Sequence, residues 1–184
     1  GYIMTTVIIG AGASGLVCAI RLKQNNKNDD VVLLERLDTL GKKILATGNG
    51  RCNLSNENAE HYKEVIAFFE SIGLKTRTDE ERRIYPYSNQ ATTVKGLLEE
   101  ECNRLGVKTV KDCEAKSIAK DLTVLTNKGK IKADNVVVAT GGKAQSSLGS
   151  NGSGYDLLKN LGHTIRPYPL LSFSSLRRAN THGS

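Results

Sequence analysis

The sequence predicts an α/β fold, in which a parallel sheet of Rossmann type carries helices and a small β-meander. Three observations support this fold class. An apolar strand pattern at residues 5–9 (TTVII) runs directly into a glycine-rich segment at residues 10–15 (GAGASG). A second apolar segment, residues 31–35 (VVLLE), follows after one helix length. A third, residues 136–140 (VVVAT), is followed by two more glycines.

The first part of the chain is expected to form a βαβ unit. Residues 13–24 place Leu16, Ala19 and Ile20 at the spacing of one helix face. Residues 25–30 are polar and are typical of a turn. The helix therefore connects two strands that run parallel to each other.

Two further helices are expected in the middle of the chain, each ended by a glycine. The first covers residues 58–72 and is closed by Gly73, and the second covers residues 91–105 and is closed by Gly106. The polar segment between them, residues 76–90, is expected to be extended or looped.

The remaining segments have a less regular pattern. Residues 41–56 (GKKILATGNGRCNLSN) show no sustained period and contain three glycines, which indicates a loop. Residues 107–133 hold three short strand candidates that bear lysines, with a turn at residues 127–129, and we expect the meander there. A short helix is expected over residues 155–161, after the glycine-rich loop at residues 149–154.

Composition narrows the class of protein. With 184 residues, of which 39% are hydrophobic and 24% charged, the chain is typical of one globular domain. It has no apolar run near the ~20 residues that span a bilayer and no secretory signal pattern, so we expect a cytoplasmic protein without a membrane partner. The cysteines lack metal or disulfide spacing and are expected to be small buried hydrophobic residues: Cys18, Cys52, Cys102 and Cys113. No metal site is expected, because the histidines have no ligand spacing either: His61, His163 and His182.

The net charge of +7 raises the question of nucleic acid binding. The surplus lies toward the C-terminal end, on lysines spread over short strand candidates, where such residues usually protect a sheet edge. Aromatic residues make up only 5% of the chain and tryptophan is absent, so a platform for stacking bases is missing. We therefore expect no nucleic acid partner.

The glycine-rich segment matches the GxGxxG fingerprint of dinucleotide-binding turns. A lone match is weak evidence, but this one follows a buried strand and opens a helix. Gly10 permits the tight turn, Gly12 lets the backbone approach a pyrophosphate, and Gly15 allows close packing of helix and strand. The first helical residues, Ala13 and Ser14, complete a helix N-terminus that attracts phosphates. The alternative is a purely structural glycine turn in an α/β protein.

An acidic residue completes the fingerprint. Glu35 ends the second strand pattern, 20 residues after Gly15, where a carboxylate accepts hydrogen bonds from both hydroxyls of the adenosine ribose. The neighbouring Arg36 is included in the expected cofactor site. FAD and NAD share this fingerprint, so a flavoprotein and an NAD-binding dehydrogenase domain both remain possible. A third alternative is a non-catalytic nucleotide- or RNA-binding module, which the scattered lysines argue against.

The chain also resembles a known family. The resemblance is carried by GKKILATGNGRCNLSN, RIYPYSNQA at residues 83–91, ATGGKAQSSLGSNGSGYDLLKNLGHTI at residues 139–165, and the N-terminal fingerprint. These segments are similar to those of the bacterial BaiN-like flavoproteins, also described as aminoacetone-oxidase-like or bile-acid-reductase-like FAD enzymes. The resemblance covers roughly residues 4–166 in family order. It implies bound FAD and an oxidoreductase that acts on a small organic substrate, with NADH or NADPH as a candidate electron donor.

The resemblance also implies further cofactor residues. One group would surround the cofactor near its flavin end: Lys43, Thr47, Gly48, Asn49, Arg51, Cys52 and Asn53. The backbone of Ala115 would meet the adenine, and Thr140 and Gly141 would close over the dinucleotide. Cys52 beside Arg51 could be a reactive thiol, but packing for the cysteine and phosphate contact for the arginine are the preferred interpretation. No catalytic acid or base is assigned.

The chain departs from the family in length, because family members are roughly twice as long. We interpret residues 1–166 as the FAD-binding domain and residues 167–184 as an unaligned tail. We expect that this sequence does not include the family's substrate domain and returning C-terminal segment. Such a fragment is expected to be inactive alone, and the apolar surface that it exposes would favour self-association.

Overall fold

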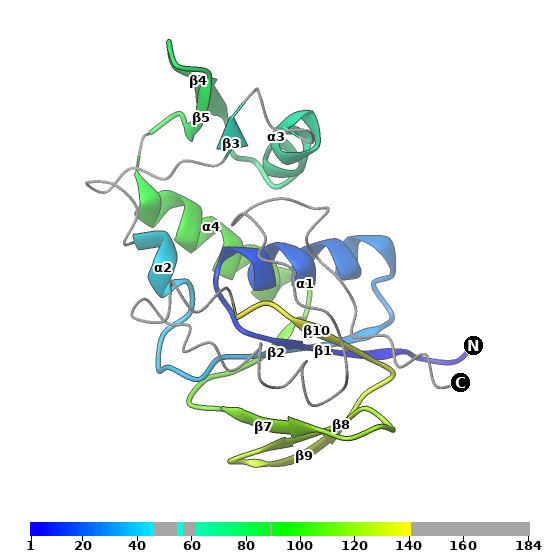
Figure 1. Ribbon diagram of the computed structural model, residues 1–184. Coiled ribbons are helices and arrows are strands. Elements are labelled where there is room, and N and C mark those ends of the chain that lie inside the picture. The colour runs from blue at the N-terminus through cyan, green and yellow to red at the C-terminus, as the bar shows by residue number, and fades with distance from the viewer. Residues whose placement is uncertain (46–54, 57–61, 89, 141–184) are drawn as a thin grey trace.

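The structure is a computed structural model, and it describes residues 1–45, 55–56, 62–88 and 90–140 (Figure 1). Its centre is a four-stranded parallel sheet with the strand order β10-β1-β2-β6. These strands are β1 (Thr5–Ile9), β2 (Asp30–Leu34), β6 (Lys108–Val110) and β10 (Asn135–Val138). The fold is therefore α/β of Rossmann type, as the apolar strand patterns predict.

The two faces of this sheet are covered by different layers (Figure 1). Alternate residues of each strand face opposite sides. On one side Ile8, Leu33 and Val137 are buried in the same core as the helices α1 (Ala13–Asn25) and α4 (Ala91–Arg104). On the other side, Val7, Leu34 and Val136 share a second core with the β-meander. Successive residues of each strand are thus buried on alternate faces of the sheet.

The βαβ unit forms as its sequence predicts. Leu16, Ala19 and Ile20 are fully buried against the sheet. The helix α1 ends at Asn25, and the backbone N–H of Asn26 donates to the Leu22 carbonyl. Lys23 is buried, and its Nζ donates to the carbonyl oxygens of Lys27 at 2.9 Å and Asp29 at 2.8 Å. These two bonds satisfy the buried ammonium group and fix the turn into β2.

The middle of the chain contains the two predicted helices and more strand than expected. The helix α3 (Tyr62–Ser71) ends just before Gly73, and α4 ends just before Gly106. Residues 58–61, where the first helix was expected to begin, lie outside the described residues. A small antiparallel sheet has the order β3-β5-β4, formed by β3 (Ser55–Asn56), β4 (Thr76–Thr78) and β5 (Arg83–Pro86).

The prediction of a loop over residues 41–56 is wrong at both ends. A short helix, α2 (Lys42–Leu45), begins directly after Gly41, and β3 lies at the other end. Ile44 of this helix is fully buried, so tertiary packing stabilises a turn of helix that is too short to show a period in the sequence.

The segment of residues 107–133 holds four strands where the sequence predicts three. The meander consists of β7 (Ala115–Ile118), β8 (Thr123–Thr126) and β9 (Gly129–Lys132). The fourth strand of this segment, β6, does not belong to the meander and pairs with β2 in the parallel sheet. Strands of three or four residues are defined by their partners more than by their own pattern, which explains why the sequence predicts too few of them.

Several predictions fall outside the described residues. They concern the loop at residues 149–154, the helix at residues 155–161 and the tail at residues 167–184. The three histidines and Cys52 lie there as well. The other three cysteines, Cys18, Cys102 and Cys113, are buried, as predicted, and none of these three is part of a disulfide. Within the described part of the chain, no helix has the length and apolar character needed to cross a membrane.

Candidate dinucleotide-binding site

The three fingerprint glycines have different surroundings: Gly10 directly follows β1, Gly12 is the N-cap of α1, and Gly15 lies in the first turn of α1. Gly10 has a φ of +104°, and a Cβ there would lie 2.8 Å from the carbonyl oxygen of Ala139. A Cβ at Gly15 would overlap the Gly10 carbonyl oxygen. Both glycines are therefore required by the fold itself, at the close approach of turn, helix and strand.

Gly12 differs from the other two. Its φ of −77° and ψ of −168° are open to any residue, and a Cβ there would have no described residue within 4 Å. Neither backbone conformation nor packing among the described residues requires a glycine at this position. The missing side chain leaves room for a ligand to approach the backbone, as the pyrophosphate interpretation predicts.

The N-terminus of α1 lies at the same place. Gly12 is its N-cap residue and supplies no side chain, and the first turn, with Ala13 and Ser14, carries no acidic residue. The positive end of the helix dipole is therefore not neutralised by the helix's own residues. An anion next to Gly12 would be stabilised there.

Glu35 follows β2 at the neighbouring position of the same sheet edge. Its backbone N–H donates a hydrogen bond to the carbonyl oxygen of Val110 at 2.9 Å, and its own carbonyl oxygen accepts one from the backbone N–H of Cys113 at 2.8 Å. Its carboxylate is buried, with a residue exposure of 6%, and Oε2 accepts a hydrogen bond from the Leu37 N–H at 3.2 Å. Burial raises the pKa of this carboxyl, and nearby backbone N–H groups together with the charge of Arg36 partly oppose the rise.

The end of β10 closes over the glycine turn. The Ala139 N–H donates to the Ile9 carbonyl at 2.8 Å, which extends the pairing of β1 and β10 by one residue. The Cα of Thr140 would lie 3.1 Å from a Cβ at Gly10. Thr140 is therefore beside the turn, where the resemblance to flavoproteins places it. Gly141 lies outside the described residues.

The loop after β2 also touches the turn. The N–H of Gly41 donates to the Ala11 carbonyl at 2.8 Å, directly before α2 begins. Lys43 lies in α2. The sequence does not single out Gly41, although it stands at the start of the segment GKKILATGNGRCNLSN. The remaining predicted residues of this segment are outside the described part: Thr47, Gly48, Asn49, Arg51, Cys52 and Asn53.

Ala115 stands apart from these residues in the chain. It begins β7, is buried, and belongs to the core that also contains Ile9 and Leu34 from the ends of β1 and β2. The backbone of Cys113, two residues earlier, is bonded to Glu35. The meander is therefore tied to the strand ends of the site, while contact of Ala115 with an adenine stays a prediction.

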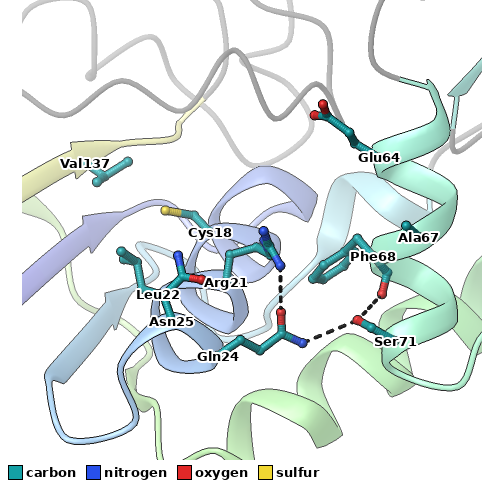
Figure 2. Close-up of a pocket in the computed structure, with 10 residues that line it drawn as sticks. All are labelled: Cys18, Arg21, Leu22, Gln24, Asn25, Glu64, Ala67, Phe68, Ser71 and Val137. Carbon is teal, nitrogen blue, oxygen red and sulfur yellow. Dashed lines mark hydrogen bonds between the residues drawn. The ribbon is translucent and has the colours of Figure 1, made fainter.

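A separate pocket lies along the C-terminal half of α1 (Figure 2). Its volume is about 540 Å³, and it is lined by residues of α1, α3 and β10, none of them a predicted cofactor residue. Gln24 connects its polar side chains, since it accepts from Arg21 at 3.3 Å and donates to Ser71 at 3.4 Å. Among the described residues, no group of three or more His, Cys, Asp or Glu side chains could hold a metal ion.

Comparison with known proteins identifies the family of this chain. The sequence profile of the HI0933-like protein Rossmann domain matches residues 4–63 and 59–183. The chain belongs to this family. The HI0933-like domain is an FAD-binding Rossmann domain, so the predicted resemblance to flavoproteins and the predicted fold class are confirmed.

The curated relatives of this HI0933-like chain are longer proteins. It is 41% identical over 182 residues to the 3-dehydro-bile acid delta(4,6)-reductase of Clostridium scindens, which covers 87% of the chain and 44% of the relative. It is 28% identical to the ribosomal RNA dihydrouridine synthase of Escherichia coli, over 88% of the chain and 45% of the relative. The chain thus spans less than half the length of these relatives.

Solved structures with low sequence identity share the fold. The open conformation of a flavocytochrome c3 fumarate reductase matches with a TM-score of 0.67 at 14% identity, over 87% of the chain and 40% of that structure. THI4 of Thermovibrio ammonificans matches with a TM-score of 0.57 at 15% identity, over 72% of the chain and 55% of that structure.

Proposed function

We propose that this chain is the FAD-binding part of a reductase that adds hydrogen across a carbon–carbon double bond of its substrate. The observation that carries the cofactor assignment is Gly12, a glycine that neither conformation nor packing requires, at a helix N-terminus beside the buried carboxylate of Glu35. This arrangement fits an adenosine joined to a pyrophosphate.

The residues of the chain bind and orient the cofactor rather than perform its chemistry. The N–H groups at the start of α1 would hold the pyrophosphate, and Glu35 would accept hydrogen bonds from the ribose hydroxyls. Thr140 would confine the dinucleotide from the β10 side. FAD supplies hydride transfer when it is bound and reduced. The segment at residues 41–56 would extend the site toward the flavin, as the family resemblance implies.

The type of reaction is inferred from the relatives. The names of the Clostridium scindens and Escherichia coli proteins both describe saturation of a carbon–carbon double bond, in a bile acid and in a uridine of ribosomal RNA. The shared chemistry supports a flavin reductase in preference to an NAD-binding dehydrogenase domain. NADH or NADPH is the proposed source of electrons.

Two substrate classes are consistent with this reaction. A small organic molecule with an activated double bond is the first candidate, because the more similar relative is a bile acid reductase at 41% identity. A uridine in RNA is the second candidate, because two relatives at 26% and 28% identity are ribosomal RNA dihydrouridine synthases and the net charge is +7. The lysines of the meander would then contact phosphates rather than protect a sheet edge.

The test uses the purified protein under anaerobic conditions. We expect visible flavin absorption from this chain. We expect bleaching by NADH or NADPH, and reoxidation by a steroid with a double bond conjugated to a ketone, from a protein in which the family's substrate domain accompanies the chain. Reoxidation by a uridine-containing ribosomal RNA fragment, with binding that weakens steeply as salt rises, would identify the second candidate instead. Binding of NAD without any flavin would refute the proposal.

A further inference from the structure

The peptide unit between Ala11 and Gly12 lies at the centre of the glycine turn and is held from one side. The carbonyl oxygen of Ala11 accepts a hydrogen bond from the N–H of Gly41 at 2.8 Å. Ala11 has no exposed surface, and Gly41 is buried as well. The bond therefore joins the turn after β1 to the loop after β2, in a part of the site that water does not reach.

The direction of this bond determines where the other end of the peptide unit points. A trans peptide is planar, and its C=O and N–H point in opposite directions. The described residues contain no cis peptide bond. Because the Ala11 carbonyl points toward Gly41, the N–H of Gly12 points away from it. We propose that Gly41 is a positioning residue that keeps the Gly12 N–H available to a pyrophosphate, an inference that rests on the proposed function.

Such a restraint is needed because of the glycine itself. A peptide unit flips by rotation about the ψ of the residue before it and the φ of the residue after it. A glycine on one side makes this flip easy, since it tolerates φ values that other residues avoid. After a flip, the Ala11 carbonyl oxygen would face the anion and repel it. The hydrogen bond from Gly41 opposes that rotation.

The surroundings of Gly41 explain why the restraint depends on a glycine. Its φ is +64°, a value that strains other residues. A Cβ at this position would lie 3.2 Å from Cγ of Lys95 and 3.3 Å from Cδ1 of Ile44. Lys95 is held on α4 by its ion pair with Glu99, at 3.3 Å. A side chain at residue 41 would therefore push the backbone away from Ala11 or displace two packed neighbours.

The test is the substitution Gly41→Ala, with affinities for FAD, ADP and adenosine measured by calorimetry or NMR titration. The affinities for FAD and ADP should fall roughly tenfold or more, because both ligands carry the pyrophosphate. The affinity for adenosine should change less than about twofold, because Glu35 still contacts the ribose. A purely structural role would not separate ADP from adenosine in this way.

Gly73→Ala is the matched control. Gly73 follows the end of α3 with a φ of +89°, and in the described part of the chain no atom would lie within 4 Å of a Cβ there. The substitution Gly73→Ala imposes the same kind of backbone strain as Gly41→Ala, but at a residue that forms no hydrogen bond to the glycine turn after β1. We expect a lower melting temperature and unchanged affinities for FAD and ADP.

Gly41→Asn is the second variant, since asparagine enters positive φ more readily than alanine. It should retain more ADP affinity than Gly41→Ala, and it decides the question if the alanine variant does not fold. Wild-type affinity for ADP in a folded Gly41→Ala protein would overturn the inference, as would an equal loss for ADP and adenosine. Failure of the wild-type protein to bind either FAD or ADP would instead refute the proposed function.

Discussion

The two ends of α1 present different kinds of surface. At its N-terminus, the glycine turn, the helix dipole and the buried Glu35 carboxylate meet at the carboxyl edge of the sheet. Along its C-terminal half, a pocket of about 540 Å³ lies between α1 and α3. There the side chains of Arg21, Gln24 and Ser71 form hydrogen bonds with one another (Figure 2).

This difference shows that the size of a hollow does not by itself indicate a cofactor site. In the pocket, polar side chains bond to each other, which stabilises the contact between α1 and α3. At the turn, the decisive feature is Gly12. Neither its φ and ψ nor the packing of the described residues around it requires a glycine, so the missing side chain leaves room for a ligand. Substitutions at the two ends of α1 should therefore have opposite consequences for cofactor binding and for packing.

The largest effect is expected from Gly12→Val. The side chain would occupy the space through which a pyrophosphate approaches the backbone, while the extended φ and ψ of residue 12 accept a valine. We expect a folded protein with no measurable affinity for FAD or ADP. Circular dichroism and calorimetric titration would measure both properties.

The matched control for this prediction is Gly96→Val on α4. A Cβ at Gly96 also has no neighbour within 4 Å, but the residue lies on an exposed part of a different helix. The Gly96→Val protein should bind FAD with the affinity of the wild type. A Gly12→Val protein that retains its flavin would show that the dinucleotide approaches elsewhere.

The sequence predicts the parts of the fold that depend on local pattern. The strand over residues 5–9, the helix that follows it and the two glycine-terminated helices agree with the structure to within a few residues. The pairing of β6 with β2, the short α2 and the sheet of β3, β5 and β4 are not predicted. Each of these elements has four residues or fewer, too few to show a repeated pattern, and is stabilised by residues distant in the chain.

The candidate site divides in the same way. Gly10, Gly12, Gly15 and Glu35 follow a fixed spacing along a βαβ unit, so the sequence identifies them without knowledge of the tertiary structure. The role of Gly41 depends on a hydrogen bond between residues 30 positions apart (41 − 11 = 30) and on its packing against Lys95. Such a contact leaves no periodic pattern in the sequence and is visible only in the tertiary structure.

The next effect concerns Glu35. Glu35→Ala removes the charge-assisted hydrogen bonds to the ribose, which together are worth about 1.5–3 kcal/mol. We expect the affinity for FAD and adenosine to fall about 10–100-fold. Glu100→Ala, which removes the same charge from an exposed position of α4, is the control and should bind normally. Unchanged adenosine binding in Glu35→Ala, measured by titration, would exclude this residue from the site.

A smaller effect is expected in the stability of the protein without cofactor. Burial raises the pKa of Glu35 in the folded state above its value in the unfolded chain. Its contribution to the free energy of unfolding is therefore fully present below the unfolded pKa and is lost as the pH rises through the folded pKa. Glu35→Gln should gain stability relative to the wild type over this window.

Urea denaturation of both proteins at several pH values between the unfolded pKa and neutrality measures this difference. Added FAD should reduce it, because ribose hydroxyls that donate to the carboxylate favour its charged form. A difference that does not change with pH would mean that the folded protein ionises Glu35 as easily as the unfolded chain does.

The smallest effect on the cofactor is expected from the pocket at the other end of α1. Gln24→Ala removes two long side-chain hydrogen bonds, to Arg21 at 3.3 Å and Ser71 at 3.4 Å, both at exposed positions. Such a change alters the free energy of unfolding by about 0.5 kcal/mol or less. The affinity for FAD should stay within about twofold of the wild type, because none of the removed contacts reaches the glycine turn. A tenfold loss of FAD affinity, measured by titration beside Glu35→Ala, would show that the contact between α1 and α3 sets the position of the helix N-terminus. The pocket would then belong to the cofactor site after all, and the contrast between the two ends of α1 would not hold.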